Sequence, residues 1–297
     1  MSNTRWTTRD LPRMDGRTVV VTGANSGLGL VTSRELAQVG ARVVLAVRDT
    51  ERGAATAREI GGATEVRKLD LADLGSIRAF AEQWSEPIDV LINNAGIMMV
   101  PEGRTADGFE RQFGTNHLGH FALTNLLLPH LTDRVVTVSS QAHRRGRIDL
   151  ADLNWKTRPY SPSGAYGQSK LANLLFTLEL QRRLTAVGAP LRAVAAHPGW
   201  AATNLQGHTQ NPIAHLAMSV GNKLIAQDAT AGALPTLFAA TQDLPPAAYI
   251  GPDGFYEYRG YPKPVGRSDD ASNSELAQEL WSASEKLTGV TFPITAE

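Results

Sequence analysis

The chain contains no cysteine among its 297 residues. Disulfide bonds, thiolate zinc sites and a cysteine nucleophile are therefore excluded. The seven histidines include no His-Glu-x-x-His arrangement, which argues against a zinc hydrolase. An excess of either charge is also missing, because 29 basic residues balance 29 acidic residues without long blocks. This balance does not indicate a nucleic acid or an anionic membrane as a partner.

Long apolar runs and a secretory leader are absent as well. The richest apolar stretch, residues 121–131, is interrupted by polar residues and a proline, so it does not reach the length of a membrane span. Residues 1–17 are polar and lack the apolar centre of a signal peptide. We find no internal repeat, low-complexity tract or linker. We therefore expect a soluble, cytoplasmic protein with a single domain that spans residues 1–297.

Short β-branched runs alternate with helical patterns along most of the chain. The predicted strands are 17–22, 41–47, 64–69, 88–92, 134–139, 191–196 and 248–250. The predicted helices are about 30–39, 73–84, 107–131, 165–184, 230–240 and 274–287. This alternation predicts right-handed βαβ units and an α/β fold of the Rossmann type. We expect a doubly wound, mainly parallel sheet of about seven strands with helices on both faces, which makes three layers.

A glycine-rich turn follows the first predicted strand and precedes a helix. Glycines let the backbone approach a pyrophosphate closely, and the helix N-terminus offers free N–H donors. The spacing G-x-x-x-G-x-G differs from the common G-x-G-x-x-G pattern, and an ordinary turn is the alternative. The position directly after the first strand favours a nucleotide site. The candidate contacts are Gly23, Asn25, Ser26, Gly27, Leu28 and Gly29.

Arg48 ends the second predicted strand. An NAD-specific site usually has an acidic residue there, which holds the ribose 2′-hydroxyl. A guanidinium can instead pair with a 2′-phosphate, so the sequence favours NADP(H) as the cofactor. NAD(H) stays open, because Asp49 follows immediately. The alternative reading of Arg48 is a solvated arginine at a strand end.

Further small or polar residues follow the other predicted strands. The carboxyl ends of parallel strands meet at one edge of the sheet, where ligands of such folds bind. Asp70 can contact an adenine edge or merely shape a turn, and the sequence does not separate these readings. The remaining predicted cofactor contacts are Asp70, Leu71, Asn94, Ala95, Gly96, Pro198 and Gly199.

Tyr166 and Lys170 lie four residues apart near the start of a predicted helix. This spacing places a phenol and an ammonium on the same helix face. A nearby positive charge favours the phenolate, so we expect the pKa of Tyr166 to be lowered and its proton to exchange near neutral pH. Taken alone, the pair is more typical of a solvated helix surface. Its place beside the strand-end residues favours a catalytic role.

The motifs, taken in order, resemble those of the short-chain dehydrogenase/reductase family from about residue 16 to at least residue 251. The motifs are Thr22-Gly23-x3-Gly27-x-Gly29, Asn93-Asn94-Ala95-Gly96, Asn116, Ser139-Ser140, Tyr166-x3-Lys170 and Pro198-Gly199. The phrases at 116–121 and 169–173 and the Leu280-Trp281 helix are similar to the branch of retinol dehydrogenases and WW-domain oxidoreductases.

The resemblance implies a role for four side chains. Tyr166 would be the general acid and base, and Lys170 would lower its pKa and hold the nicotinamide ribose. Ser140 would hydrogen-bond the substrate oxygen, and Asn116 would hold a water in a proton relay to Lys170. Tyr166 and Lys170 would thus be both catalytic and cofactor-binding residues.

The stretch between the serine and the tyrosine is longer than in many family members. Ser140 and Tyr166 are 26 positions apart, about twice the usual spacing, so we interpret residues 141–165 as an addition on the substrate side. Ser139 stays an alternative to Ser140. The sequence of residues 200–226 fits a flap over the pocket and an ordinary helical connection equally well. Residues 251–297 are interpreted as a C-terminal tail.

The sequence thus predicts an NADP(H)-dependent oxidoreductase for a carbonyl/alcohol pair, with a hydrophobic substrate such as a retinal-like or other aldehyde or ketone. The alternatives are a catalytically silent NADP(H)-sensing protein, an epimerase and a reductase of a C=C bond. A homodimer or homotetramer is open, because the helix at 165–184 can serve as a dimer face in the family. Its outer positions Gln168, Glu179 and Arg182 fit solvent equally well.

Overall fold

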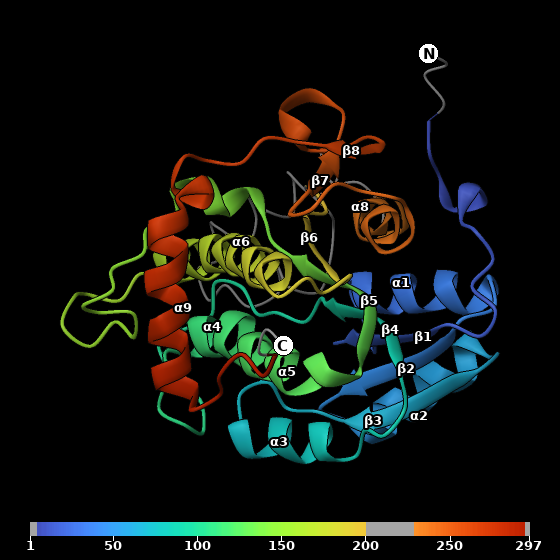
Figure 1. The fold of residues 1–297 in the computed structure, drawn as a ribbon, viewed down its shortest axis with the longest axis horizontal. Coiled ribbons are helices and arrows are strands. Elements are labelled where there is room, and N and C mark those ends of the chain that lie inside the picture. The colour runs from blue at the N-terminus through green and yellow to red at the C-terminus, as the bar shows by residue number, and fades with distance from the viewer. Residues whose placement is uncertain (1–4, 200–228, 295–297) are drawn as a thin grey trace.

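The computed structural model describes residues 5–199 and 229–294, and within these ranges the strands form one eight-stranded sheet (Figure 1). The strand order is β3-β2-β1-β4-β5-β6-β7-β8. The strands are β1 Thr18–Thr22, β2 Arg42–Val47, β3 Thr64–Lys68, β4 Ile88–Asn93, β5 Leu131–Val138, β6 Arg192–Ala196, β7 Tyr249–Pro252 and β8 Pro262–Pro264. The segment 200–226 lies outside the described residues, so its two readings stay open.

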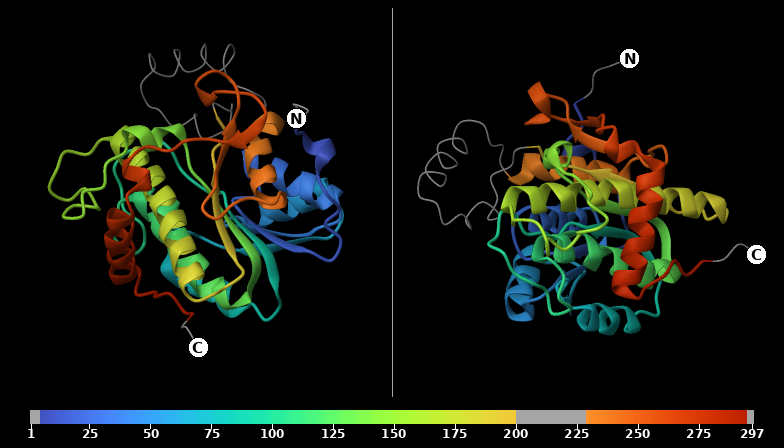
Figure 2. Two further views of the ribbon diagram at one scale, coloured as in Figure 1. Left: turned by 45° about the horizontal axis from the view of Figure 1, so that its top comes forward. Right: turned by 90° about the vertical axis from the view of Figure 1, so that its left-hand side faces the viewer.

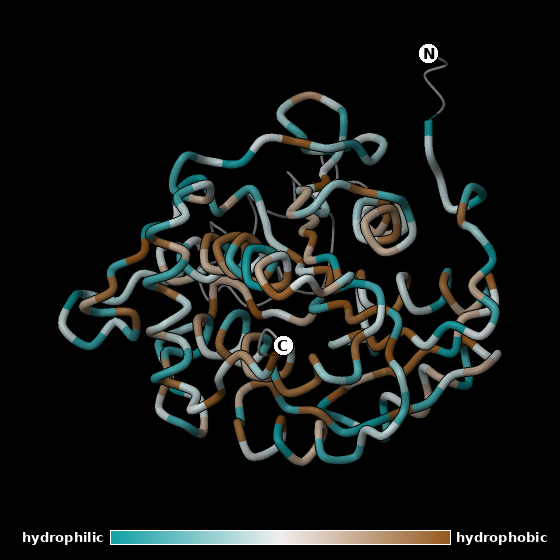
Figure 3. Tube along the Cα trace, viewed as in Figure 1, coloured by the Kyte–Doolittle hydropathy of each residue, from teal (hydrophilic) through white to brown (hydrophobic). Residues whose placement is uncertain are grey.

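The sheet is buried on both faces because its central strands are made of β-branched residues. All five residues of β1 are buried, and their side chains alternate between two apolar cores. Val20 and its neighbours Val44 and Leu91 contribute to one core, whereas Val19 and Val21 contribute to the other. Apolar residues concentrate along these strands in Figure 3. This pattern is typical of a parallel sheet between two helical layers.

The helices divide between the two faces. One layer consists of α1 Gly27–Gln38, α2 Thr50–Ile60 and α8 Ala229–Thr241. The other consists of α3 Leu74–Glu82, α5 Gly119–Leu127 and α6 Pro162–Ala186. The predicted doubly wound, three-layer fold is therefore confirmed. Among the described residues, none of the helices combines the length and the apolar character that crossing a bilayer would need.

The structure differs from the predicted elements at three places. β8, which is antiparallel to β7, was not predicted because Pro-Lys-Pro is typical of a loop. α2 was not predicted either, since its sequence carries few large apolar residues. The region 107–131 is not one helix: it contains α4 Arg111–Phe113, a π-helical turn Gly114–Leu118 and α5.

A further helix, α9 Ser274–Thr288, lies across α6 on the side away from the sheet (Figure 2). Its Trp281 stacks on Phe176 of α6 at 5.7 Å between ring centroids. Gln168 and Glu179 of α6 are 0% and 1% exposed. Of the two readings that the sequence leaves open for these positions, a dimer face and solvent, exposure to solvent is therefore wrong, because α6 is covered from both sides.

Candidate active site

The glycine turn after β1 has the backbone shape that close approach to a ligand requires. Gly23 and Gly27 have φ of +66° and +53°, which favours glycine at both positions. A Cβ on Gly29 would lie 2.4 Å from the Gly23 carbonyl oxygen and 2.5 Å from Asn94 Nδ2. The turn therefore leaves no room for a side chain at position 29.

The first turn of α1 keeps its backbone donors available. Ser26 is the N-cap residue, but its side chain makes no capping hydrogen bond. Amide groups at a helix N-terminus that lack a side-chain cap can bind an anion such as a phosphate. The remaining predicted contacts of this turn, Asn25 and Leu28, lie in the turn and the first turn of α1. The glycine turn thus fits the pyrophosphate of a dinucleotide.

The ends of β1 and β4 are joined through Thr22. Its Oγ1 accepts hydrogen bonds from the amides of Asn94 and Ala95, both at 2.9 Å, and Asn94 Nδ2 donates to the Thr22 carbonyl at 2.8 Å. The strand order reverses between these two strands, which is where ligands of doubly wound sheets bind. The sequence indicated Thr22 only as part of the glycine motif. Its position at the end of a predicted strand could also have identified it as a residue at the ligand-binding edge of the sheet.

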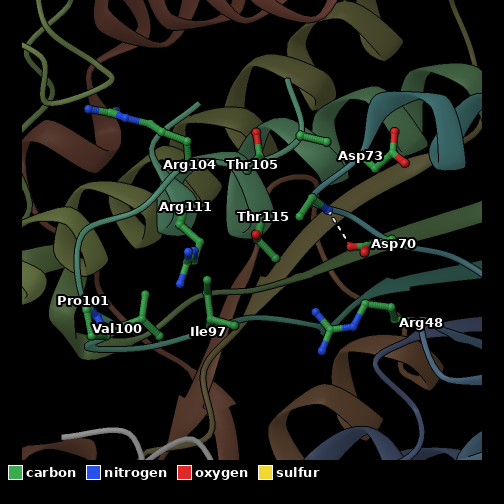
Figure 4. A pocket seen from close by; sticks show the side chains of 12 residues that line it. Arg48, Asp70, Asp73, Ile97, Val100, Pro101, Arg104, Thr105, Arg111 and Thr115 are labelled. Atoms are coloured by element: carbon green, nitrogen blue, oxygen red, sulfur yellow. Dashed lines mark hydrogen bonds between the residues drawn. The ribbon is translucent and has the colours of Figure 1, made fainter. Parts of the chain in front are cut away.

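A cavity of about 660 Å³ lies beside the ends of β2, β3 and β4 (Figure 4). Arg48 and Arg111 line it and extend into the space between the labelled side chains, so it suits an anionic or polar ligand group. Arg104 also lines the cavity, but its guanidinium points away and donates to the Asn154 and Trp155 carbonyls. Asp70 lines the cavity, and its Oδ1 accepts a hydrogen bond from the Ala72 amide at 2.9 Å. Asp70 therefore shapes the turn whether or not it also contacts a ligand. Arg111 was not singled out in the sequence, since its helix position carries no strand-end signal.

Leu71 is a core residue by its side chain. It is 8% exposed and packs in the apolar core. Its carbonyl oxygen would lie 2.4 Å from a Cβ on Gly119 at the start of α5. The side chain of Leu71 is therefore packed inside the protein, and a cofactor contact at this position stays a prediction.

Tyr166 and Ser140 face each other across the site. Ser140 follows β5 and Tyr166 lies in the second turn of α6, and the Ser140 hydroxyl is near enough to influence the pKa of the phenol. Burial raises the pKa of Tyr166 to about 12, although the interaction with the Ser140 hydroxyl opposes this shift. The sequence predicted the opposite direction, because it considered only the charge of Lys170. The phenol keeps its proton at neutral pH, as a proton donor requires.

Lys170 is buried directly behind the tyrosine. Its Nζ lies 5.7 Å from the centroid of the Tyr166 ring and donates to the Val138 carbonyl at 3.1 Å. Burial lowers the pKa of Lys170 to about 8. A Cβ on Gly96 would lie 3.5 Å from Nζ, so the loop after β4 passes directly beside the ammonium. Lys170 thus places a positive charge near the phenol.

Asn116 lies in the π-helical turn, where such irregularities are frequent at functional sites. Its Nδ2 donates to the Ile97 carbonyl and to Ser169 Oγ, both at 2.9 Å, and its Oδ1 accepts from the Ile97 amide at 2.8 Å. Both amide hydrogens are therefore used within the protein. A relay water held by Asn116 would have to donate to one of its oxygen atoms.

The two adjacent serines have different surroundings. Ser139 is 1% exposed and its hydroxyl donates to the Lys170 carbonyl at 2.8 Å, so it holds α6 against β5. Ser140 instead faces Tyr166 and accepts from the Ala142 amide at 3.2 Å. This geometry favours Ser140 over Ser139 as the residue that contacts a substrate oxygen.

Pro198 and Gly199 follow β6 at the same edge of the sheet. Gly199 has φ of +66°, and its amide donates to His197 Nδ1 at 3.2 Å. A Cβ on Gly199 would lie 2.5 Å from the Tyr258 carbonyl oxygen. The turn is thus packed against residues 255–258, a contact that no sequence signal indicated.

Two buried histidines make the fold sensitive to acid. Burial lowers the pKa of His117 to about 3 and that of His120 to about 4, with further lowering from a neighbouring histidine and lysine, respectively. His120 Nδ1 donates to the Asn116 carbonyl at 3.0 Å, and its Nε2 accepts from the Thr22 hydroxyl at 2.9 Å. Below a pH of about 6.5 the unfolded chain binds protons that the folded protein does not.

We expect the free energy of unfolding to fall as the pH drops from about 6.5 toward 4, by about 2 kcal/mol at pH 5 for each such histidine. Urea titrations near pH 7 and near pH 5 measure this loss. His117→Gln should reduce the difference between the two pH values, while His130→Gln, at a partly exposed position, should leave it unchanged. If the wild type, His117→Gln and His130→Gln lose the same free energy of unfolding between the two pH values, His117 is not a source of the acid sensitivity.

Comparison with known proteins finds relatives over almost the whole chain. The family described as short chain dehydrogenase matches residues 17–213. Human retinol dehydrogenase 13 is 42% identical over 298 residues, which cover 95% of this chain and 87% of that protein. Mouse retinol dehydrogenase 12 is 42% identical over 293 residues, with 94% of this chain and 89% of that protein covered.

Solved structures give the same picture. An uncharacterised protein from Mycobacterium paratuberculosis is 58% identical, with a TM-score of 0.86 over 98% of this chain and all of that chain. The NADP complex of RhlG from Pseudomonas aeruginosa is 25% identical, with a TM-score of 0.61 over 78% of this chain and 92% of that chain.

Proposed function

The chain belongs to the short-chain dehydrogenase/reductase family, and on that premise we propose that it uses NADP(H) to interconvert a carbonyl and an alcohol on an apolar substrate. The predicted resemblance to the retinol dehydrogenase branch is confirmed by relatives at 42% identity. The chain is accordingly an oxidoreductase. The observation that best supports our proposal is the protonated Tyr166, which faces Ser140 beside the buried ammonium of Lys170.

The residues at the sheet edge fit a nicotinamide dinucleotide. The glycine turn and the uncapped start of α1 would hold the pyrophosphate, and Arg48 would pair with a 2′-phosphate. Asn94, Ala95 and Gly96 after β4 and the Pro198–Gly199 turn would line the nicotinamide end. When bound, the cofactor supplies or accepts the hydride.

The side chains of the protein handle the proton and the developing charge. Ser140 and Tyr166 would hydrogen-bond the substrate oxygen, and Tyr166 would donate its proton as that oxygen becomes an alcohol. The ammonium of Lys170, 5.7 Å from the ring, stabilises the phenolate that remains. The raised pKa of Tyr166 keeps the phenol protonated at neutral pH, which is the form that carbonyl reduction needs, so we propose reduction as the main direction.

The proposed substrate is an apolar aldehyde or ketone. The support is that the relatives over 94–95% of the chain are named retinol dehydrogenases. A purified sample with NADPH and a panel of retinal-like, aliphatic, aromatic and quinone carbonyls should consume NADPH fastest with an apolar aldehyde or ketone. Binding of NADPH without turnover of any carbonyl would instead support a silent sensing protein.

Arg48 provides the test of the cofactor preference. A charge-assisted hydrogen bond contributes about 1.5–3 kcal/mol, so Arg48→Ala should lower kcat/KM for NADPH by about 10- to 100-fold. The value for NADH should change little, because NADH has no 2′-phosphate. The control is Arg52→Ala, an exposed arginine in α2. An equal loss with both cofactors would show that Arg48 does not select the phosphate.

A further inference from the structure

Glu257 lies between the two segments that carry Ser140 and Gly199. It belongs to the short helical turn Phe255–Glu257 between β7 and β8. Its Oε2 accepts hydrogen bonds from His197 Nε2 at 2.9 Å and from Gln141 Nε2. Its Oε1 is 3.8 Å from an Arg144 guanidinium nitrogen. One carboxylate therefore contacts the segment after β5 and the segment after β6.

The first contact leads to Gly199 through a buried imidazole. His197 is 0% exposed, and its Nδ1 accepts from the Gly199 amide at 3.2 Å. The proton of the neutral ring must therefore be on Nε2, which faces Glu257. A Cβ on Gly251 would lie 2.1 Å from this Nε2, so the ring is closely confined. The contact between His197 and Glu257 fixes the orientation of the ring and, through it, the position of the Gly199 amide.

The second contact leads to Ser140. Gln141 is the next residue, and its Oε1 accepts from Arg144 Nε at 3.0 Å. These two side chains belong to the 3-10 helix Gln141–Arg145, whose N-cap is Ser140. The Ser140 carbonyl accepts from His143 Nδ1 at 2.7 Å. Glu257 therefore holds the short helix that orients the Ser140 hydroxyl.

The backbone that presents Glu257 is strained. Tyr256 and Glu257 have φ of +48° and +57°, a region that residues with a side chain rarely adopt. Such strain persists only where surrounding contacts impose it, and it concentrates at functional sites. The carbonyl of Glu257 would lie 2.9 Å from a Cβ on Gly199, so the strained turn packs directly against this glycine.

We propose that Glu257 is a positioning residue that fixes the Ser140 segment and the Pro198–Gly199 turn relative to each other. The substrate-binding hydroxyl and the turn beside the nicotinamide are thereby held in the arrangement that hydride transfer needs. This inference rests on the proposed function. It adds a residue that is 116 positions from Gln141 in the sequence.

The test compares Glu257→Ala and Glu257→Gln with Glu86→Ala. Glu86 is an exposed carboxylate that pairs with Arg42 at the amino-terminal ends of the strands, away from the site, so it is a matched control. We expect Glu257→Ala to lower kcat by about 10- to 100-fold and to weaken NADPH binding, measured by nicotinamide fluorescence. The decreases in kcat and in NADPH binding should be smaller in Glu257→Gln, because the amide oxygen still accepts a hydrogen bond from His197. Unchanged kcat and NADPH affinity in Glu257→Ala would overturn the proposal.

A double-mutant cycle with Ser140→Ala separates positioning from general loosening. If Glu257 acts through Ser140, the fold decrease in kcat of the variant that carries both substitutions should be much smaller than the product of the fold decreases of the two single variants. Losses that multiply fully would overturn the proposal.

Hydrogen exchange tests the same proposal without turnover. In Glu257→Ala, the amides of residues 140–145 and of Gly199 should exchange faster, while those of Glu86→Ala should not change. Unchanged exchange would overturn the positioning role. If the wild type turns over no carbonyl, but Glu257→Ala still exchanges these amides faster than the wild type, only the proposed function would be refuted.

Discussion

Tyr166→Phe should reduce the rate of NADPH-dependent carbonyl reduction by about 10²- to 10⁴-fold, the usual contribution of a positioned general acid. The phenylalanine ring keeps the packing of α6 but has no proton to give to the substrate oxygen. NADPH binding should persist, because the glycine turn and Arg48 are unchanged. The decrease in NADPH absorbance under saturating cofactor measures the rate, and fluorescence measures binding.

Tyr261→Phe is the matched control for this variant. Tyr261 is partly exposed and its ring lies against Arg5, outside the predicted site, so its turnover should equal that of the wild type. If Tyr166→Phe retains more than about a tenth of the wild-type rate, another group donates the proton. A loss of NADPH binding as well would mean that the variant disturbs the site rather than the proton transfer.

Trp281→Ala should lower the free energy of unfolding by about 3–5 kcal/mol, as is typical when a buried aromatic residue is truncated. Trp281 is 2% exposed and packs edge-on against Phe121 at 4.8 Å, besides its stacking on Phe176. Its indole donates to Glu285 at 2.8 Å. The substitution leaves a cavity between α9 and the two helices beneath it, and urea titration measures the loss.

Phe255→Ala is the control for the stability measurement. Phe255 is 81% exposed, so its truncation should change the free energy of unfolding by no more than about 0.5 kcal/mol. A loss below about 1 kcal/mol in Trp281→Ala would indicate that α9 folds independently of α5 and α6. A loss in the expected range would show that α9 is part of the cooperative core.

Much of the architecture could be predicted because it depends on local patterns. The β-branched runs Thr18–Thr22 and Arg42–Val47 can only be buried as central strands, and the parallel order then brings their carboxyl ends together. This reasoning places Gly23, Asn94 and Ser140 at one edge of the sheet from the sequence alone. The structure brings them there.

Other features depend on contacts that no local pattern reveals. The pKa of Tyr166 is set by how deeply α6 is buried, and that burial depends on the rest of the fold. The sequence leaves a dimer face and solvent open for Glu179, yet this residue is 1% exposed and pairs with Arg182 and Arg183 at 2.7–2.8 Å. Glu257 carries no sequence signal, since its partners lie after strands far away in the chain.

The two outermost strands limit how copies of the protein can associate. An edge strand with free N–H and C=O groups is a template for intermolecular pairing and aggregation. At one edge, β8 is Pro-Lys-Pro, and its two prolines have no N–H to offer an incoming strand. At the other edge, β3 carries Glu65, Arg67 and Lys68, whose charges oppose such an addition. The sheet therefore resists growth at both ends, and we expect a stable assembly of copies to use helix or loop surfaces instead.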